Sequence, residues 1–150
     1  MESMNNHLNQ AIRNEELHAV LVENEPNRFF DWKIVALFYA AYNYLKALAS
    51  KKNLNIGETQ TEMANNCNPE FSMPVMPISK EAWQQYNELM NYSKEARNNE
   101  TNDEMRQDYE SSLQLLHGFK AYIKSQGVPV LALAGKAELQ GSLVDPLKGG

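Results

Sequence analysis

One stretch of this chain limits what it can fold into, residues 31–49 with the sequence DWKIVALFYAAYNYLKALA. Apolar and aromatic side chains occupy nearly every position, so a helix over this stretch would have no polar face. A helix that is apolar all round is a buried one. We therefore expect a helix over about 31–52, enclosed on every side at the centre of a bundle. Asp31 is its expected N-cap, and Asn55 and Gly57 mark its exit.

A membrane-spanning helix is the first alternative for this stretch. A spanning helix needs about 20 apolar residues with few or no charges, and here Lys33 and Lys46 lie inside the run. Charges at bilayer depth are costly. The first ten residues, MESMNNHLNQ, lack the basic segment and apolar block of a signal peptide. These features predict a cytoplasmic protein with no membrane association.

Three further segments show helical periodicity, over about 4–24, 79–98 and 102–126. Ser79 and a capping box of Thr101 and Glu104 are the expected starts of the last two, and Gly127 is the expected stop. The first helix should bury one stripe of side chains: Leu8, Ile12, Glu15, Ala19 and Val22.

Residues 58–78 hold three prolines after position 68, which exclude a long helix there. We expect one or two helical turns and then an irregular connection. Four apolar residues should pack this connection onto the bundle: Phe71, Val75, Met76 and Ile78.

The predicted architecture is all-α, an up-and-down bundle of four long helices over 1–127. A chain of 150 residues is one domain by the usual size of domains. An irregular tail follows at 128–150, with an apolar patch from Val128 to Ala134. Such a tail docks on the bundle, docks on a protein partner, or is disordered.

Metal and cofactor sites are not expected from this sequence. The histidines His7, His18 and His117 are scattered, and the sequence contains a single Glu-x-x-His spacing, Glu15 to His18, whereas a di-iron bundle needs two. The single cysteine, Cys67, excludes an intramolecular disulfide framework and a thiolate metal cluster.

The segment RNEELH, residues 13–18, is the one candidate for catalysis. Metal-independent RNA cleavage needs a base for the ribose 2′-hydroxyl and a cation for the developing phosphate charge. His18 and Arg13 are candidates for these roles, with Asn14 beside them. On a straight helix, positions five apart lie about 140° from each other. The two side chains would therefore meet near a frayed helix start or across a two-fold dimer axis. Alternatively, Arg13 is solvated and His18 is half-buried.

Charge is unevenly distributed along the chain, whose net charge is -5. This total argues against a general nucleic-acid coat protein. Residues 28–57 nevertheless hold five basic residues against one acid, a local charge of +4. Lys51 and Lys52 could contact a phosphate chain or complement a helix C-terminus. The candidate binding residues are Lys33, Asn43, Lys46, Lys51, Lys52 and Arg97.

Two blocks of residues resemble a bacterial branch of the HEPN superfamily. In the first, Asp31 and Trp32 open a helix whose middle is the Phe-Tyr-Ala-Ala run of residues 38–41. The second is a Y-x-x-L…S-x-x-A-R helix: Tyr86, Leu89, Ser93, Ala96 and Arg97. The resemblance covers roughly residues 5–126 and implies a small helical bundle that forms a homodimer.

HEPN proteins include many ribonucleases of toxin–antitoxin and phage-defence systems, and others that are non-catalytic binding or scaffolding modules. The family's catalytic pattern is R-x4-6-H, which Arg13, Asn14 and His18 match in spelling. In the family this motif lies on the last long helix, where this chain has Arg106 and no histidine four to six residues beyond it. The resemblance thus leaves two hypotheses: an RNA-directed module with metal-independent endoribonuclease activity, and a non-catalytic dimerisation or binding module.

Overall fold

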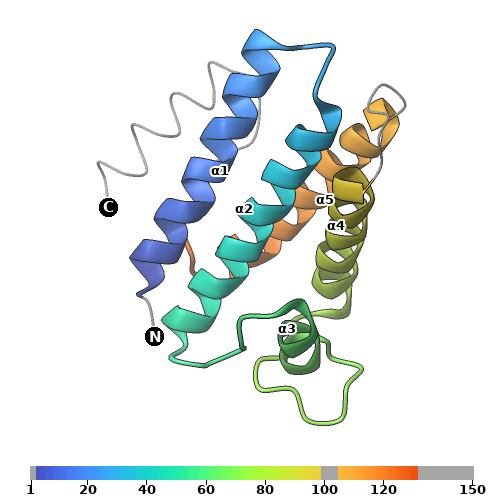
Figure 1. The fold of residues 1–150 in the computed structure, drawn as a ribbon. Helices are drawn as coiled ribbons and strands as arrows, with labels where there is room; N and C mark the ends of the chain where they lie inside the picture. Colours follow the sequence, from blue (N-terminus) through green and yellow to red (C-terminus); the bar gives the residue numbers. More distant parts are fainter. Residues whose placement is uncertain (1–2, 99–104, 132–150) are drawn as a thin grey trace.

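The computed structural model describes residues 3–98 and 105–131 of the chain. Within these ranges the fold is all-α, with no β-strand, as the sequence predicts. Four long helices and one short helix follow each other: α1 (Met4–Asn24), α2 (Phe30–Lys51), α3 (Gln60–Cys67), α4 (Lys80–Asn98) and α5 (Arg106–Ser125) (Figure 1).

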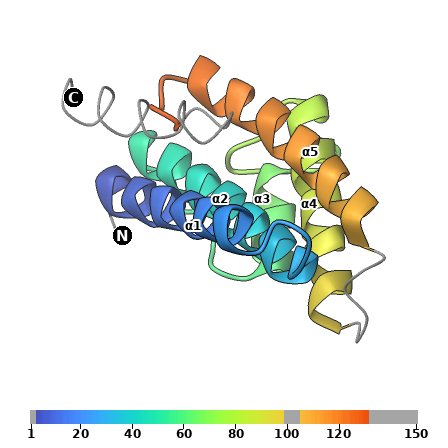
Figure 2. The same ribbon diagram turned by 90° about the horizontal axis from the view of Figure 1, so that it is seen from above.

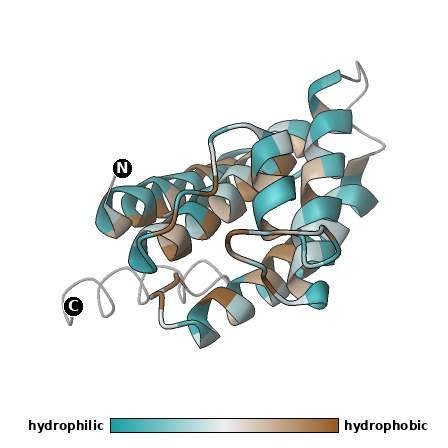
Figure 3. Cartoon of the chain, turned by 90° about the horizontal axis from the view of Figure 1, so that it is seen from below, coloured by the Kyte–Doolittle hydropathy of each residue, from teal (hydrophilic) through white to brown (hydrophobic). Residues whose placement is uncertain are grey.

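Helix α2 is the central element of the bundle, and this prediction is confirmed. It packs against α1, α4 and α5, and α4 also packs against α5. The long helices alternate in direction, and α1 and α4 lie on opposite sides of α2 (Figures 1 and 2). Hydrophobic positions lie mostly on the faces that the helices turn toward one another (Figure 3). Phe38 and Leu45 of α2 are fully buried in this core.

The expectation that α2 is enclosed on every side is wrong for one stripe of the helix. Trp32 is 59% exposed, and Tyr39, Tyr42 and Asn43 are only half-buried. These four positions recur at helical spacing on one side of α2. The rings of Tyr39 and Tyr42 pack against the core, and the Tyr42 hydroxyl donates to the Glu58 carbonyl at 3.2 Å.

The start of α2 also differs from the prediction, because Asp31 is not the N-cap. The helix begins at Phe30, and Phe29 occupies the cap position with a left-handed φ of 58°. Phe30 is buried against Ile34, Ala96 and Met105, and this packing extends the helix toward its N-terminus. Asp31 instead lies in the first turn, where its charge still favours the helix start.

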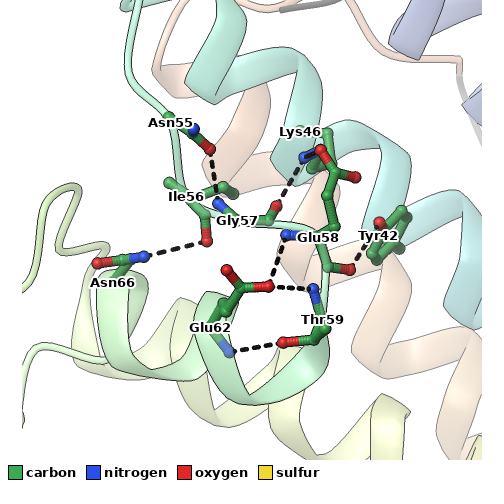
Figure 4. Close-up of polar contacts among 9 residues, drawn as sticks. All are labelled: Tyr42, Lys46, Asn55, Ile56, Gly57, Glu58, Thr59, Glu62 and Asn66. Carbon is green, nitrogen blue, oxygen red and sulfur yellow. Dashed lines mark hydrogen bonds and ion pairs between the residues drawn. The ribbon is translucent and has the colours of Figure 1, made fainter.

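The exit from α2 is set by Asn53, not by Asn55 or Gly57. Asn53 has φ 58°, and the next N–H, of Leu54, donates to the carbonyl of Ala49 at 2.9 Å. This is the Schellman arrangement that ends many helices. Gly57, with φ 90°, turns the chain into α3, whose capping box is formed by Thr59 and Glu62 (Figure 4).

The connection over 58–78 contains the two helical turns that were expected, as α3. Met76 and Ile78 are buried, which confirms the expected packing, whereas Phe71 and Val75 are exposed and do not contribute to it. The N–H groups of Met76 and Ile78 donate to carbonyls at the end of α3, so this part of the loop is held close to that helix.

The remaining helix ends follow the sequence signals. The N–H of Ala82 donates to the Ser79 hydroxyl at 3.1 Å, so Ser79 caps α4. Gly127 ends α5 with φ 89°, as predicted. The capping box expected at Thr101 and Glu104 lies outside the described residues. In α1, Leu8, Ile12 and Glu15 are buried as expected, but Val22 in the last turn is exposed.

No helix within the described residues is both long and apolar enough to cross a bilayer.

Candidate functional site

The three residues of the predicted catalytic motif lie on different sides of α1. Arg13 is exposed, Asn14 is half-buried with its side-chain amide donating to the Gln10 carbonyl, and His18 is buried. This is the separation that five helical positions impose. Within one copy of the chain, Arg13 and His18 therefore face different surroundings, and the catalytic assignment stays a prediction.

His18 points into the bundle toward α5. Its Nε2 atom and the Tyr109 hydroxyl form a hydrogen bond of 2.7 Å, and the two rings are in contact. Burial, together with the nearby charges of Lys33 and Lys120, lowers the pKa of His18 to about 4. Burial raises the pKa of Tyr109 to about 12. Both groups are therefore neutral at pH 7, and a base of such low pKa is poorly matched to proton abstraction.

A second buried polar contact lies one turn away, and the sequence did not predict it. Glu15 of α1 is fully buried, and its Oε1 atom lies 2.6 Å from the Lys120 ammonium of α5. Its Oε2 atom accepts a hydrogen bond from the Tyr44 hydroxyl of α2. Burial raises the pKa of Glu15 and lowers that of Lys120, against the attraction between the two charges. We call Glu15, Tyr44 and Lys120 the interior polar network.

A signal for this network is present in the sequence. Glu15 falls on the apolar stripe of α1, and Lys120 falls beside the core positions Phe119 and Ile123 of α5. A charged residue on each of two core stripes predicts a buried pair, because an isolated buried charge is very unfavourable. The partner could not be chosen from the sequence, since 105 positions separate the two residues.

The interior polar network also holds the segment that follows α5. We call residues 128–131 the strap, since Val128 and Leu131 are buried and the chain between them forms no helix or strand. The N–H of Leu131 donates to the Tyr44 hydroxyl at 3.1 Å. The tail thus docks on the bundle as far as Leu131, and residues 132–150 lie outside the described part.

The docking of the strap is energetically marginal. Burying one valine and one leucine contributes about 3–6 kcal/mol, and the hydrogen bond to Tyr44 adds about 1 kcal/mol. Ordering the backbone of four residues costs about 4–8 kcal/mol. We call the surface beneath Val128–Leu131, around the Tyr44 hydroxyl, the groove. The terms nearly cancel, so the strap can leave the groove without unfolding the bundle.

A pocket of about 560 Å³ lies between the start of α1, the end of α2 and the loop before α3. Its volume is in the range of small-molecule sites. Lys46, a predicted binding residue, lines it with only 9% of its side chain exposed. The ammonium donates to the Gly57 carbonyl at 2.7 Å and to the Glu58 carboxylate at 3.0 Å (Figure 4). The other lining residues are His7, Ala49, Ser50, Leu54, Asn55 and Ile56.

The other predicted binding residues also donate to groups of the chain itself. At the start of α2, the buried Lys33 ammonium donates to the Glu25 carbonyl at 2.6 Å. Asn43 donates to the Tyr39 carbonyl, and the exposed Arg97 donates to the Tyr39 hydroxyl. These contacts give each of the three residues a structural partner, and their assignment to binding stays a prediction.

Lys51 and Lys52 lie at the end of α2, beside the end of α5. Lys51 donates to the Gln126 carbonyl at 3.2 Å, and Lys52 donates to the Gln126 side-chain oxygen at 3.4 Å. Gln126 is the C-cap of α5. The two lysines therefore complement a helix C-terminus, although it belongs to another helix than their own.

Metal coordination finds no support in the part of the chain that the structure describes. No three side chains of His, Cys, Asp or Glu there are grouped closely enough to hold an ion. Burial raises the pKa of the Cys67 thiol to about 12, so it stays protonated and is a poor nucleophile. Among residues 3–98 and 105–131, three buried side-chain atoms lack a hydrogen-bond partner: His18 Nδ1, Asp31 Oδ1 and Ser93 Oγ.

No protein-family model, curated protein or solved structure matches this chain in sequence or fold.

Proposed function

We propose that this chain is a non-catalytic, HEPN-like binding module that assembles as a homodimer. The observation that carries the proposal is the placement of His18. Its Nε2 atom is engaged by Tyr109, the side chain is buried, and its pKa is about 4. Arg13 is exposed on the other side of the same helix. A phosphate bound at Arg13 would therefore not be within reach of His18 in the same copy.

The outward side of α1 is the surface that we assign to self-association. Four exposed residues recur there at helical spacing, and we call them the α1 outward face: Arg13, Leu17, Val20 and Asn24. Leu17 is 50% exposed and Val20 is 52% exposed. Two adjacent aliphatic side chains at the middle of an edge helix favour contact with another apolar surface.

Charge complementarity favours a second copy in this position. The last turn of α1 contains no basic residue, and Lys33 of α2 supplies a first cation to this C-terminus by donating to the Glu25 carbonyl at 2.6 Å; a second copy would add another. In an antiparallel α1–α1 pair centred between Leu17 and Val20, Arg13 of each copy lies beside Asn24 of the other. Each arginine then complements the C-terminus of the opposite helix.

The proposal is tested by measuring mass in solution and RNA cleavage on the same preparations. We expect a homodimer for the wild type and a monomer for Leu17→Lys/Val20→Lys. The matched control is Met73→Lys/Val75→Lys, which places the same two charges on exposed apolar residues elsewhere. A wild type that stays monomeric, or a double variant that stays dimeric, would contradict the interface.

RNA cleavage decides whether the module is catalytic. We expect none in EDTA, either for the wild type or for His18→Gln. Cleavage by the wild type that disappears in both His18→Gln and Arg13→Gln would instead establish the metal-independent endoribonuclease. The helical content of each variant is checked by circular dichroism, so that loss of folding is not mistaken for loss of activity.

A further inference from the structure

The groove beneath the strap recognises an extended segment by a small set of contacts. Val128 and Leu131 are buried in it, Pro129 is exposed, and Val130 is half-buried. A single backbone group of the strap, the Leu131 N–H, donates to Tyr44 at 3.1 Å. The groove therefore contacts three aliphatic side chains, Val128, Val130 and Leu131, and accepts one main-chain donor at Tyr44.

The polar contact in the groove is fixed by the bundle itself. The Tyr44 hydroxyl donates to Glu15, and Glu15 is held by Lys120 at 2.6 Å. These three residues come from α2, α1 and α5, so their positions depend on the packing of three helices. Because its own proton is committed to Glu15, the Tyr44 oxygen can serve only as an acceptor toward a fourth group. The acceptor for a docking segment is thus already oriented.

One glycine controls whether the strap returns to its own bundle. Gly127 has φ 89°, a conformation that other residues rarely adopt, and the Val128 N–H then reaches back to the Ile123 carbonyl. A Cβ atom at position 127 would lie 2.7 Å from the Lys51 ammonium. Any extended conformation at Gly127 would direct residues 128–131 away from the groove of the same copy.

We infer that the groove is a docking site for the strap of a second copy of this chain, so that two copies can exchange residues 128–131. The segment with demonstrated complementarity to the groove is this sequence, Val-Pro-Val-Leu. Exchange keeps the burial of Val128 and Leu131 and the hydrogen bond to Tyr44, and it changes the turn at Gly127 together with the Val128–Ile123 hydrogen bond, which makes it a low-cost route to association. This inference goes beyond the proposed function, because it uses α2 and α5 and not the α1 outward face.

The first experiment measures binding of a labelled peptide with the sequence of residues 126–134 to the full chain. In Leu131→Asp the strap's own anchor is lost and the groove is vacated, whereas in the wild type the strap competes with the peptide. We expect the variant to bind the peptide about twofold more tightly than the wild type, since nearly balanced docking leaves about half of the wild-type grooves filled. The peptide carrying the same Leu131→Asp change should not bind.

Met73→Asp provides the matched control, since Met73 is an exposed aliphatic residue far along the chain from the strap. It should bind the peptide as weakly as the wild type. A Leu131→Asp chain that is fully helical and binds no better than the wild type would overturn the inference. So would equal binding of the peptide that carries aspartate.

The second experiment measures the oligomeric state of Gly127→Ala in the Leu17→Lys/Val20→Lys background. Alanine strains the turn that returns the strap, while the groove is unchanged, so we expect the dimer fraction to rise. Adding Leu131→Asp should return it to a monomer. A Gly127→Ala chain that remains monomeric at all concentrations would contradict exchange, whatever the wild type shows at the α1 outward face. This experiment also carries the test if Leu131→Asp does not fold.

Discussion

Replacing Lys120 by methionine tests the energetic role of the interior polar network. Methionine keeps most of the lysine's length and removes the charge, so Glu15 is left buried with the Tyr44 hydroxyl as its remaining hydrogen-bond donor. Removing one partner of a buried ion pair typically costs about 3–5 kcal/mol. The free energy of unfolding of a whole domain is about 5–15 kcal/mol. Lys120→Met should therefore remove a large fraction of the free energy of unfolding of the bundle.

A second variant separates loss of charge balance from loss of packing. In Glu15→Gln/Lys120→Met both charges are absent, and the glutamine oxygen can still accept from Tyr44. Replacing a buried pair by neutral groups of similar volume is often neutral or stabilising. We expect the loss of unfolding free energy in the double variant to be smaller, by about 2 kcal/mol or more, than the sum of the losses in the two single variants. Residues in direct contact are coupled by such amounts.

The assay is urea denaturation followed by circular dichroism, with the slope m compared between variants. Lys124→Met, at an exposed position of the same helix, should stay within about 0.5 kcal/mol of the wild type. The stability of Lys120→Met should also improve as the pH falls toward the ordinary pKa of glutamate. Burial raises the pKa of Glu15, so folding favours its protonated form, and that contribution is lost as the pH rises. A Lys120→Met loss as small as that of Lys124→Met, at every pH, would refute this account.

Three further outcomes follow from contacts elsewhere in the fold. His18 has a pKa of about 4 in the folded chain and an ordinary pKa of 6.5, so it contributes about 3 kcal/mol to the free energy of unfolding above pH 6.5, and this contribution is lost as the pH falls toward 4. His18→Gln should therefore flatten this part of the plot of stability against pH. His117→Gln, at an exposed position, should leave it unchanged. Gly57→Ala should lower the midpoint of thermal unfolding, because φ is 90° there and a Cβ would lie 2.4 Å from Glu62 Cβ; a midpoint equal to that of the wild type would show that the turn before α3 can relax. Ser79→Ala should cost about 1 kcal/mol in urea denaturation by removing the cap of α4, whereas Ser72→Ala, at an exposed position of the same loop, should cost nothing measurable.

The helices and the central place of α2 could be predicted because periodicity is a local property. An apolar pattern without a polar face has one solution in an all-α chain, which is burial among several neighbours. Ser79 and Gly127 were predicted correctly for the same reason, since each acts on backbone groups within a few residues. The start of α2 was missed because a tertiary contact, the burial of Phe30, outweighed the capping preference of Asp31.

The candidate site was only partly predictable, because its contacts join residues far apart in the sequence. The pattern R-N-x3-H identified Arg13 and His18, and of the two alternatives weighed for them the structure favours a solvated Arg13 and an inward-facing His18. The partner of His18 is 91 positions away and that of Glu15 is 105 positions away. Lys33 and Lys46 were assigned to binding from the local positive charge of residues 28–57, and the sequence did not show that both ammonium groups donate to backbone carbonyls.

The central position of α2 has a consequence for how this sequence can diverge. Substitutions in α1, α4 or α5 disturb packing against fewer neighbouring helices, and the exposed positions of these helices can change in sequence with little effect on the fold. Most changes in α2 meet several neighbours at once, so few replacements are tolerated there. Relatives of this chain should therefore retain the segment after Trp32 long after the rest of their sequences have become unrecognisable, and that segment is the best probe with which to search for them.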